Sequence, residues 1–92
     1  MKPYKEKIIN KNISERTFSE KNKKDFFWHR DLEDRKIIVI EAGNSWFIQL
    51  DNCLPQELIP GIIITINAYV FHRVIAGTGN LKIKIVKSFK EM

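Results

Sequence analysis

Three side chains carry the chemistry that this sequence could perform: His29, Asp31 and His72. His29 and Asp31 are two residues apart in an aromatic segment, so on a β-strand they would point to the same face. His72 is the only other histidine in the chain. Two imidazoles and one carboxylate that converge with open positions form the triad that suits Fe(II). The residue types therefore predict a site for Fe(II) or another divalent metal ion, provided that the fold brings His72 to the other two.

Alternating and β-branched residues favour strands over most of the chain. Period-two patterns and turn residues every eight to twelve positions are typical of a sandwich or barrel. No apolar stripe with the helical period extends over ten residues, although a short helix within residues 13–24, capped by Ser14, is left open. The aromatic residues are expected in the core, because each buries a large area. The expected strands are 26–30, 36–41, 45–50, 55–59, 62–67, 70–76 and 81–87, and the expected core aromatics are Phe26, Phe27, Trp28, Trp46, Phe47 and Phe71.

The first of the two segments that hold the histidines resembles a motif of the cupins, G-x5-H-x-H-x3-4-E-x6-G. His29 stands at the first histidine, Asp31 at the second, Lys36 at the glutamate and Gly43 at the closing glycine. The opening glycine is absent, because Lys23 occupies its position. The spacing is retained while the residue types have partly changed.

The second segment resembles the other cupin motif, G-x5-P-x-G-x2-H-x3-N. Gly61 and His72 are retained, whereas Asn67, Tyr69 and Ala76 replace the proline, the second glycine and the asparagine. The resemblance covers residues 29–76, about half of the chain. It implies an all-β fold, the small cupin-type jelly roll or double-stranded β-barrel, with a metal ion held inside by His29, Asp31 and His72.

Lys36 is the main departure from the cupin pattern. A protonated ammonium cannot coordinate a metal ion, so an inward Lys36 would instead pair with Asp31. Two hypotheses therefore stay open. One is a metal-dependent cupin that acts on or binds a small organic molecule. The alternative is a non-enzymatic ligand- or partner-binding module without metal, in which His29, Asp31, Lys36 and His72 form a polar network. Whether the protein is an enzyme is not decided.

Four further residues are candidates for contact with a small-molecule ligand. Lys36 would lie beside the metal ligands, and Tyr69 would sit at the barrel mouth. Gln49 would either line the barrel or hydrogen-bond a neighbouring strand. Arg73 would either clamp an anionic ligand or pair across strands with Asp34 or Glu41.

The charge is distributed unevenly between two parts of the chain. Residues 1–24 carry eight Lys or Arg against three Glu, so the whole net charge of +5 resides in this basic N-terminal arm. Two interpretations of the arm stay open: an ordered strand that swaps into a dimer partner, and a mobile tail. Residues 25–92, the expected cupin-like β-barrel, are neutral. Because the basic residues are not interleaved with stacking aromatics, a nucleic-acid partner is not expected.

Size and composition set the remaining expectations. A chain of 92 residues buries only about 60–65% of its unfolded surface, so a homodimer is expected to supply further burial. No apolar run is long enough to span a membrane, and the N-terminus lacks the apolar stretch of a secretory signal. With the single cysteine Cys53, a reducing, cytoplasmic location is expected.

Overall fold

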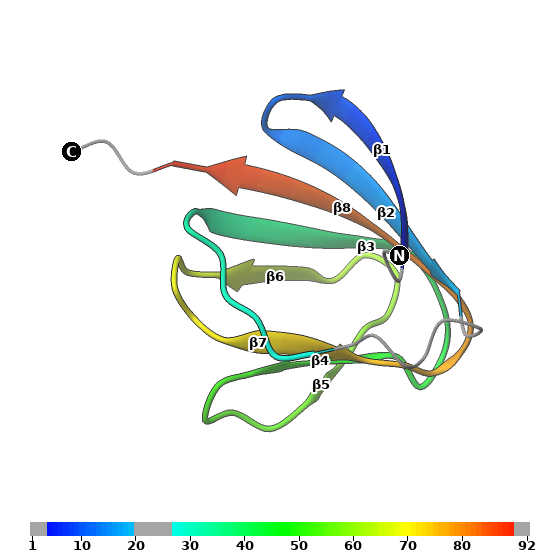
Figure 1. Ribbon diagram of the computed structural model, residues 1–92. Coiled ribbons are helices and arrows are strands. Elements are labelled where there is room, and N and C mark those ends of the chain that lie inside the picture. Colours follow the sequence, from blue (N-terminus) through cyan, green and yellow to red (C-terminus); the bar gives the residue numbers. More distant parts are fainter. Residues whose placement is uncertain (1–3, 20–26, 90–92) are drawn as a thin grey trace.

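Two antiparallel β-sheets lie one over the other and enclose the core (Figure 1). The computed structural model describes residues 4–19 and 27–89. The larger sheet has the strand order β1-β2-β8-β3-β6 and the smaller sheet has the order β5-β4-β7. This all-strand arrangement confirms the predicted fold class. The strands are β1 (Tyr4–Asn10), β2 (Ile13–Ser19), β3 (Asp34–Asn44), β4 (Phe47–Leu50), β5 (Gln56–Glu57), β6 (Ile63–Ile66), β7 (His72–Ile75) and β8 (Thr78–Ser88).

The long strands β3 and β8 form the centre of the larger sheet. Ile37 lies opposite Ile85, and Val39 lies opposite Ile83. All four side chains are buried, while the intervening Lys84 is only partly buried. A sheet with one face on the core requires this alternation, so the period-two pattern of the last strand is confirmed. Together with Trp46, Ile48 and Leu58, these residues belong to one hydrophobic core.

The N-terminal segment supplies a hairpin at one edge of the larger sheet. Strand β1 pairs with β2, and β2 pairs with β8 from Ile13 to Ser19. At the turn, the Asn10 side chain accepts hydrogen bonds from the backbone nitrogens of Asn12 and Ile13. The helix left open within residues 13–24 does not form over 13–19, and residues 20–24 lie outside the described part of the chain.

The two sheets are joined at a tight corner where β8 begins. The expected strands 70–76 and 81–87 leave residues 77–80 between them, yet β8 already starts at Thr78. A methyl group at Gly77 would overlap the carbonyl oxygen of Asn44, so the close approach of these two segments requires glycine. The indole nitrogen of the fully buried Trp46 donates a hydrogen bond to the carbonyl oxygen of Thr78, 3.1 Å away.

The aromatic residues divide between the core and the surface. Trp46 is buried as expected, whereas Phe27, Trp28 and Phe71 are exposed by 71%, 42% and 41%, so their assignment to the core was wrong. Phe26 lies outside the described residues. Over the described ranges, no helix is long and apolar enough to cross a membrane.

Candidate metal centre

A single β-bridge brings the two histidines together. The backbone nitrogen of His29 donates to the carbonyl oxygen of His72 at 3.0 Å, and the nitrogen of His72 donates to the oxygen of His29 at 2.8 Å. Directly opposed residues of an antiparallel pair point to the same face. Both imidazoles therefore face the space between the sheets, with ring centroids 4.2 Å apart. Of the segment predicted as strand 26–30, the described residues form only this bridge.

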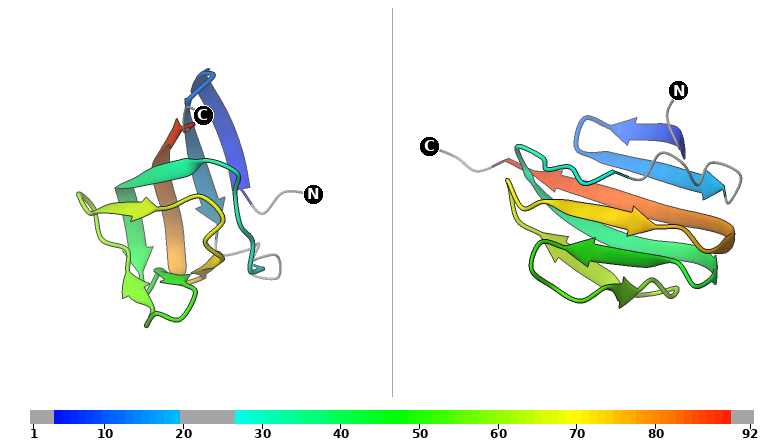
Figure 2. Two further views of the ribbon diagram at one scale, coloured as in Figure 1. Left: turned by 90° about the vertical axis from the view of Figure 1, so that its left-hand side faces the viewer. Right: turned by 60° about the horizontal axis from the view of Figure 1, so that its bottom comes forward.

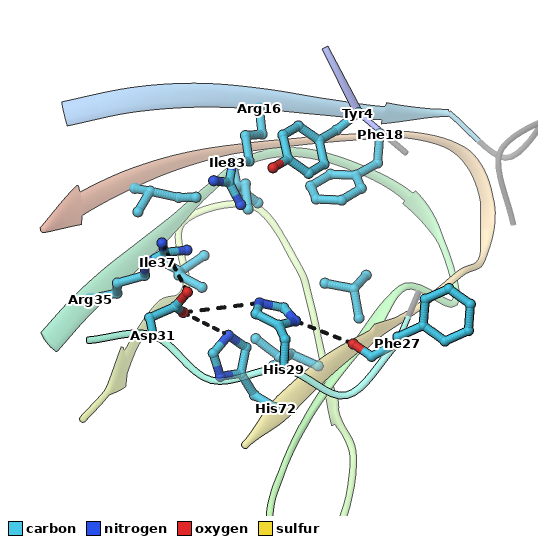
Figure 3. A pocket seen from close by; sticks show the side chains of 13 residues that line it. Tyr4, Arg16, Phe18, Phe27, His29, Asp31, Arg35, Ile37, His72 and Ile83 are labelled. Atoms are coloured by element: carbon cyan, nitrogen blue, oxygen red, sulfur yellow. Dashed lines mark hydrogen bonds and ion pairs between the residues drawn. The ribbon is translucent and has the colours of Figure 1, made fainter. Parts of the chain in front are cut away.

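Asp31 completes the cluster because it follows His29 by two positions. Its Oδ2 atom lies 3.3 Å from Nε2 of His72 and 4.0 Å from Nε2 of His29. Figure 3 shows the carboxylate directed between the two rings. Each residue offers one potential ligand atom, and the three atoms lie within 4.8 Å of one another. The three residues singled out from the sequence thus converge in space.

Hydrogen bonds to the backbone orient both imidazoles. Nδ1 of His72 lies 2.9 Å from the carbonyl oxygen of Val70, and Nδ1 of His29 lies 3.2 Å from that of Phe27. A carbonyl oxygen only accepts, so we assign the proton to Nδ1 in each ring. In the neutral tautomer, Nε2 then carries the lone pair that faces Asp31. Outer hydrogen bonds of this kind fix the tautomer and the ring orientation of metal-binding histidines.

The environment of His72 favours its neutral form. Burial lowers the pKa of this imidazole, and the nearby His29 and Arg35 lower it further, against the raising effects of the Val70 carbonyl and Asp31. A neutral His72 presents no proton to the carboxylate. Consistently, Oδ2 of Asp31 is a buried oxygen that has no hydrogen-bond partner among the described residues.

A buried arginine holds the other oxygen of Asp31. Nη2 of Arg35 lies 3.1 Å from Oδ1 of Asp31 and 3.0 Å from Oε1 of Glu33. Burial alone would raise the pKa of Glu33, but the hydrogen bond and charge of Arg35 outweigh it, so the pKa is lowered. Lys87 adds a further cation 3.9 Å from the same oxygen. The network leaves Oδ2 as the free oxygen of Asp31 on the side of the histidines.

Arg35, rather than Lys36, is the inward cation of β3. Lys36 is exposed, and Arg35 is buried. The cupin spacing places Lys36 at an inward position, whereas in the structure the neighbouring Arg35 points inward and Lys36 is exposed. Strand parity is the indication that was missed: Asp31, Glu33 and Arg35 share their parity with the buried Ile37.

The other three candidate ligand-binding residues lie away from the histidines. Gln49 and Arg73 are cross-strand neighbours on β4 and β7, and the Arg73 guanidinium donates to Oε1 of Gln49 at 2.9 and 3.1 Å. Among the described residues, Arg73 forms no hydrogen bond or ion pair with its expected partners, Asp34 and Glu41. Tyr69 is exposed, and its backbone nitrogen donates to the carbonyl oxygen of Asp31 at 2.8 Å.

A cavity of about 340 Å³ opens beside the cluster. Its volume lies at the low end of the range for small-molecule sites. Phe27 lines it and is also largely exposed, which places this ring at the mouth. Neither Lys36 nor Gln49, Tyr69 or Arg73 is among the lining residues. These are Tyr4, Arg16, Phe18, Phe27, His29, Asp31, Arg35, Ile37, Ile48, His72, Val74, Ile83 and Ile85.

Comparison with known proteins identifies the architecture. No family model and no curated protein matches the sequence. Among solved structures, KdgF from Halomonas sp. superposes with a TM-score of 0.73 at 13% identity, over 99% of this chain and 84% of that chain. An RmlC-like cupin family protein with a double-stranded β-helix fold, from Methanocaldococcus jannaschii, gives 0.71 at 14% identity, over 96% and 80%. HppE, solved with cobalt(II) and substrate, gives 0.63 at 14% identity, over 92% and 51%.

These similarities establish the fold. The chain is a cupin-fold domain, as the two motif-like segments implied. Inside it, His29, Asp31 and His72 form a cluster that could hold a metal ion. The two further views of Figure 2 show how the two sheets face each other. Strand β7 meets the segment that carries His29 through the bridge at His72.

Proposed function

We propose that this protein is a metal-dependent cupin in which His29, Asp31 and His72 bind Fe(II) or another divalent cation next to a small organic ligand. The observation that carries the proposal is the arrangement of three acceptor atoms around one point. The Nε2 atoms of the two histidines and a carboxylate oxygen without a hydrogen-bond partner among the described residues face one another within 4.8 Å. Without a cation, the lone pairs repel. A divalent ion would convert this repulsion into coordination.

The surrounding residues support a preorganised site. The carbonyl oxygens of Val70 and Phe27 hold the two rings, and Arg35 holds the outer oxygen of Asp31. Held by these three residues, a metal ion would supply Lewis-acid or oxygen-activating chemistry to a molecule bound in the cavity. The protein groups themselves orient that molecule and exclude water. HppE, a protein of the same fold, has been solved with cobalt(II) and substrate.

Titration with Co(II), and with Fe(II) under anaerobic conditions, tests the proposal. We expect one ion per chain for chelator-treated wild-type protein, measured by equilibrium dialysis and by the visible absorption of Co(II). His29→Ala and Asp31→Asn should each weaken binding by at least about tenfold, since loss of even an outer-shell partner has that effect. His29 is the more tolerant position, because 49% of its side chain is exposed.

Asp51→Asn is the matched control, because Asp51 is exposed and does not line the cavity. It should bind the ion like the wild type. A wild-type protein that takes up no stoichiometric ion, or triad variants that bind as tightly as this control, would overturn the proposal. The metal-free ligand-binding module would then be the surviving interpretation.

A further inference from the structure

A second polar group lies on the cavity wall opposite the triad. Arg16 is at the middle of β2, between Glu6 on β1 and Ile83 on β8. Its side chain is mostly buried, with 14% exposed. Figure 3 shows Arg16 with Tyr4 and Phe18 on one side of the cavity, and Asp31, His29 and His72 on the other.

The contacts of Arg16 fix its guanidinium without using most of its donors. Nε donates to Oε2 of Glu6 at 2.6 Å, and the group lies 4.2 Å from the centre of the Tyr4 ring. A guanidinium has five N–H donors, so the four on the terminal nitrogens have no partner among the described residues. The planar fork of these nitrogens matches the two oxygens of a carboxylate.

Arg35, the other cation of the lining, cannot take this role. Its guanidinium is already bound to both Asp31 and Glu33. Of the two arginines, Arg16 alone faces the cavity with donors to spare. Glu6 offsets part of its charge, yet a divalent ion at the triad would leave the cavity positive as a whole and thus favourable for an anion.

The wall between the two polar ends is apolar. It is lined by branched and aromatic side chains, namely Phe18, Ile37, Ile48, Val74, Ile83 and Ile85. A molecule that spans the cavity therefore needs an apolar middle. The two ends of this molecule must carry different chemical groups, since one end faces the triad and the other faces the Arg16 guanidinium.

We propose that Arg16 binds a carboxylate of the cavity ligand, and that the ligand is a small amphipathic acid whose opposite end lies at the triad. The placement of that opposite end rests on the proposed metal site. The carboxylate contact with Arg16 does not, because it involves a different wall of the cavity and requires no ion.

Hexanoate tests the Arg16 contact in metal-free protein, with 1-hexanol as the uncharged probe. By calorimetry, wild-type protein should bind hexanoate, and Arg16→Gln should weaken this by at least about tenfold, as expected for loss of hydrogen bonds to a charged group. Arg16→Lys keeps the pairing with Glu6 but loses the planar fork of donors. Its affinity for hexanoate should therefore lie between those of the wild type and Arg16→Gln. Binding of 1-hexanol should be weaker than that of hexanoate in the wild type and should not change in Arg16→Gln.

Arg30→Gln is the matched control, because Arg30 is exposed and stacks on Phe71 outside the cavity lining. It should bind hexanoate like the wild type, and circular dichroism verifies that every variant is folded. Failure of wild-type protein to bind hexanoate, equal binding by folded Arg16→Gln, or 1-hexanol binding as tight as that of hexanoate would each overturn the inference.

Adipate separates this inference from the proposed metal site. With Co(II) present, adipate should bind more tightly than hexanoate, and Asp31→Asn should remove that advantage without removing the effect of Arg16. If the metal site is wrong, Co(II) gives adipate no advantage while the difference between wild type and Arg16→Gln persists. If the Arg16 contact is wrong, that difference vanishes whether or not Co(II) binds.

Discussion

The two oxygens of Asp31 have different surroundings, and this difference explains why one of them is turned toward the histidines. Oδ1 pairs with Arg35, while Oδ2 faces the two histidines. A ligand whose rotamer is held by an outer partner loses less conformational freedom when it binds. In the proposed metal site, Arg35 would therefore be a positioning residue, and Glu33 in turn holds Arg35 through two hydrogen bonds.

The buried His72 predicts a pH dependence of stability for the metal-free protein. Its pKa is lowered in the folded state, so near the unfolded value of about 6.5 the unfolded chain binds more protons. Stability should accordingly be full above that value and fall as the pH drops toward the folded pKa, by no more than about 1.4 kcal/mol per pH unit for one proton. Urea unfolding in chelator between pH 8 and pH 5 measures this.

His72→Gln is the control for that titration, because glutamine keeps a polar side chain and does not titrate. Its unfolding free energy should depend less steeply on pH over the same range. Identical slopes for the variant and the wild type would show that His72 does not titrate differently in the two states.

At the residue scale, the sequence predicted that His29, Asp31 and His72 converge, but it did not predict the residues that support them. The spacing of His29 and Asp31 and the cupin-like position of His72 were sufficient to choose three residues that converge. Lys36 was misplaced because motif spacing was given more weight than strand parity. Arg16 was not singled out, since nothing in the local pattern shows that β2 passes over the same cavity.

The β-bridge between His29 and His72 also determines which way the neighbouring side chains point. The bridge between His29 and His72 places Trp28 opposite Arg73 and Arg30 opposite Phe71 on the outer face. The distances from guanidinium to ring centre are 4.9 Å for Arg73 over Trp28 and 5.2 Å for Arg30 over Phe71. One register thus directs the imidazoles inward and the aromatic residues outward, which is why Trp28 and Phe71 are not core residues.

The corner before β8 is expected to tolerate no side chain. Gly77→Ala places a methyl group against the backbone oxygen of Asn44, and overlap with backbone cannot be relieved by a rotamer change. We expect a loss of about 1–3 kcal/mol or more in unfolding free energy, measured by urea denaturation.

Gly61→Ala provides the comparison for this substitution. Gly61 has a φ of 91° but open space around its Cβ position, so alanine there costs only backbone strain, about 1–2 kcal/mol. If Gly77→Ala is as stable as the wild type, the close approach of the two segments is not a constraint on the fold.

Strand existence was more predictable than strand boundaries. The alternation of Leu81, Ile83 and Ile85 gave β8, but its first residues were hidden by the glycine-rich composition of residues 77–80. Residues 26–30 have strand-like composition, yet the described part pairs only at His29. Composition indicates which residues favour a β-strand, but it does not indicate where the hydrogen-bonded pairing of two strands ends.

At the scale of the molecule, β1 is an edge strand that another chain could cover. It lies at one end of the larger sheet, and Ile8 and Ile9 are exposed by 73% and 47%. Open edges with apolar side chains favour pairing with a further strand. Since a small domain gains stability from additional buried area, we expect a homodimer formed through β1, detected as twice the chain mass by light scattering after size-exclusion chromatography.

Ile8→Lys should shift that equilibrium toward the monomer, because it places a charge where apolar surface is expected to be buried. Ile63→Lys is the matched control: Ile63 is 61% exposed and lies on β6, at the opposite edge of the same sheet. It should leave the mass unchanged. A wild-type protein that stays monomeric at high concentration, or a control that dissociates the dimer as Ile8→Lys does, would contradict assembly through β1. The N-terminal hairpin would then serve the cavity alone, through Tyr4, Arg16 and Phe18.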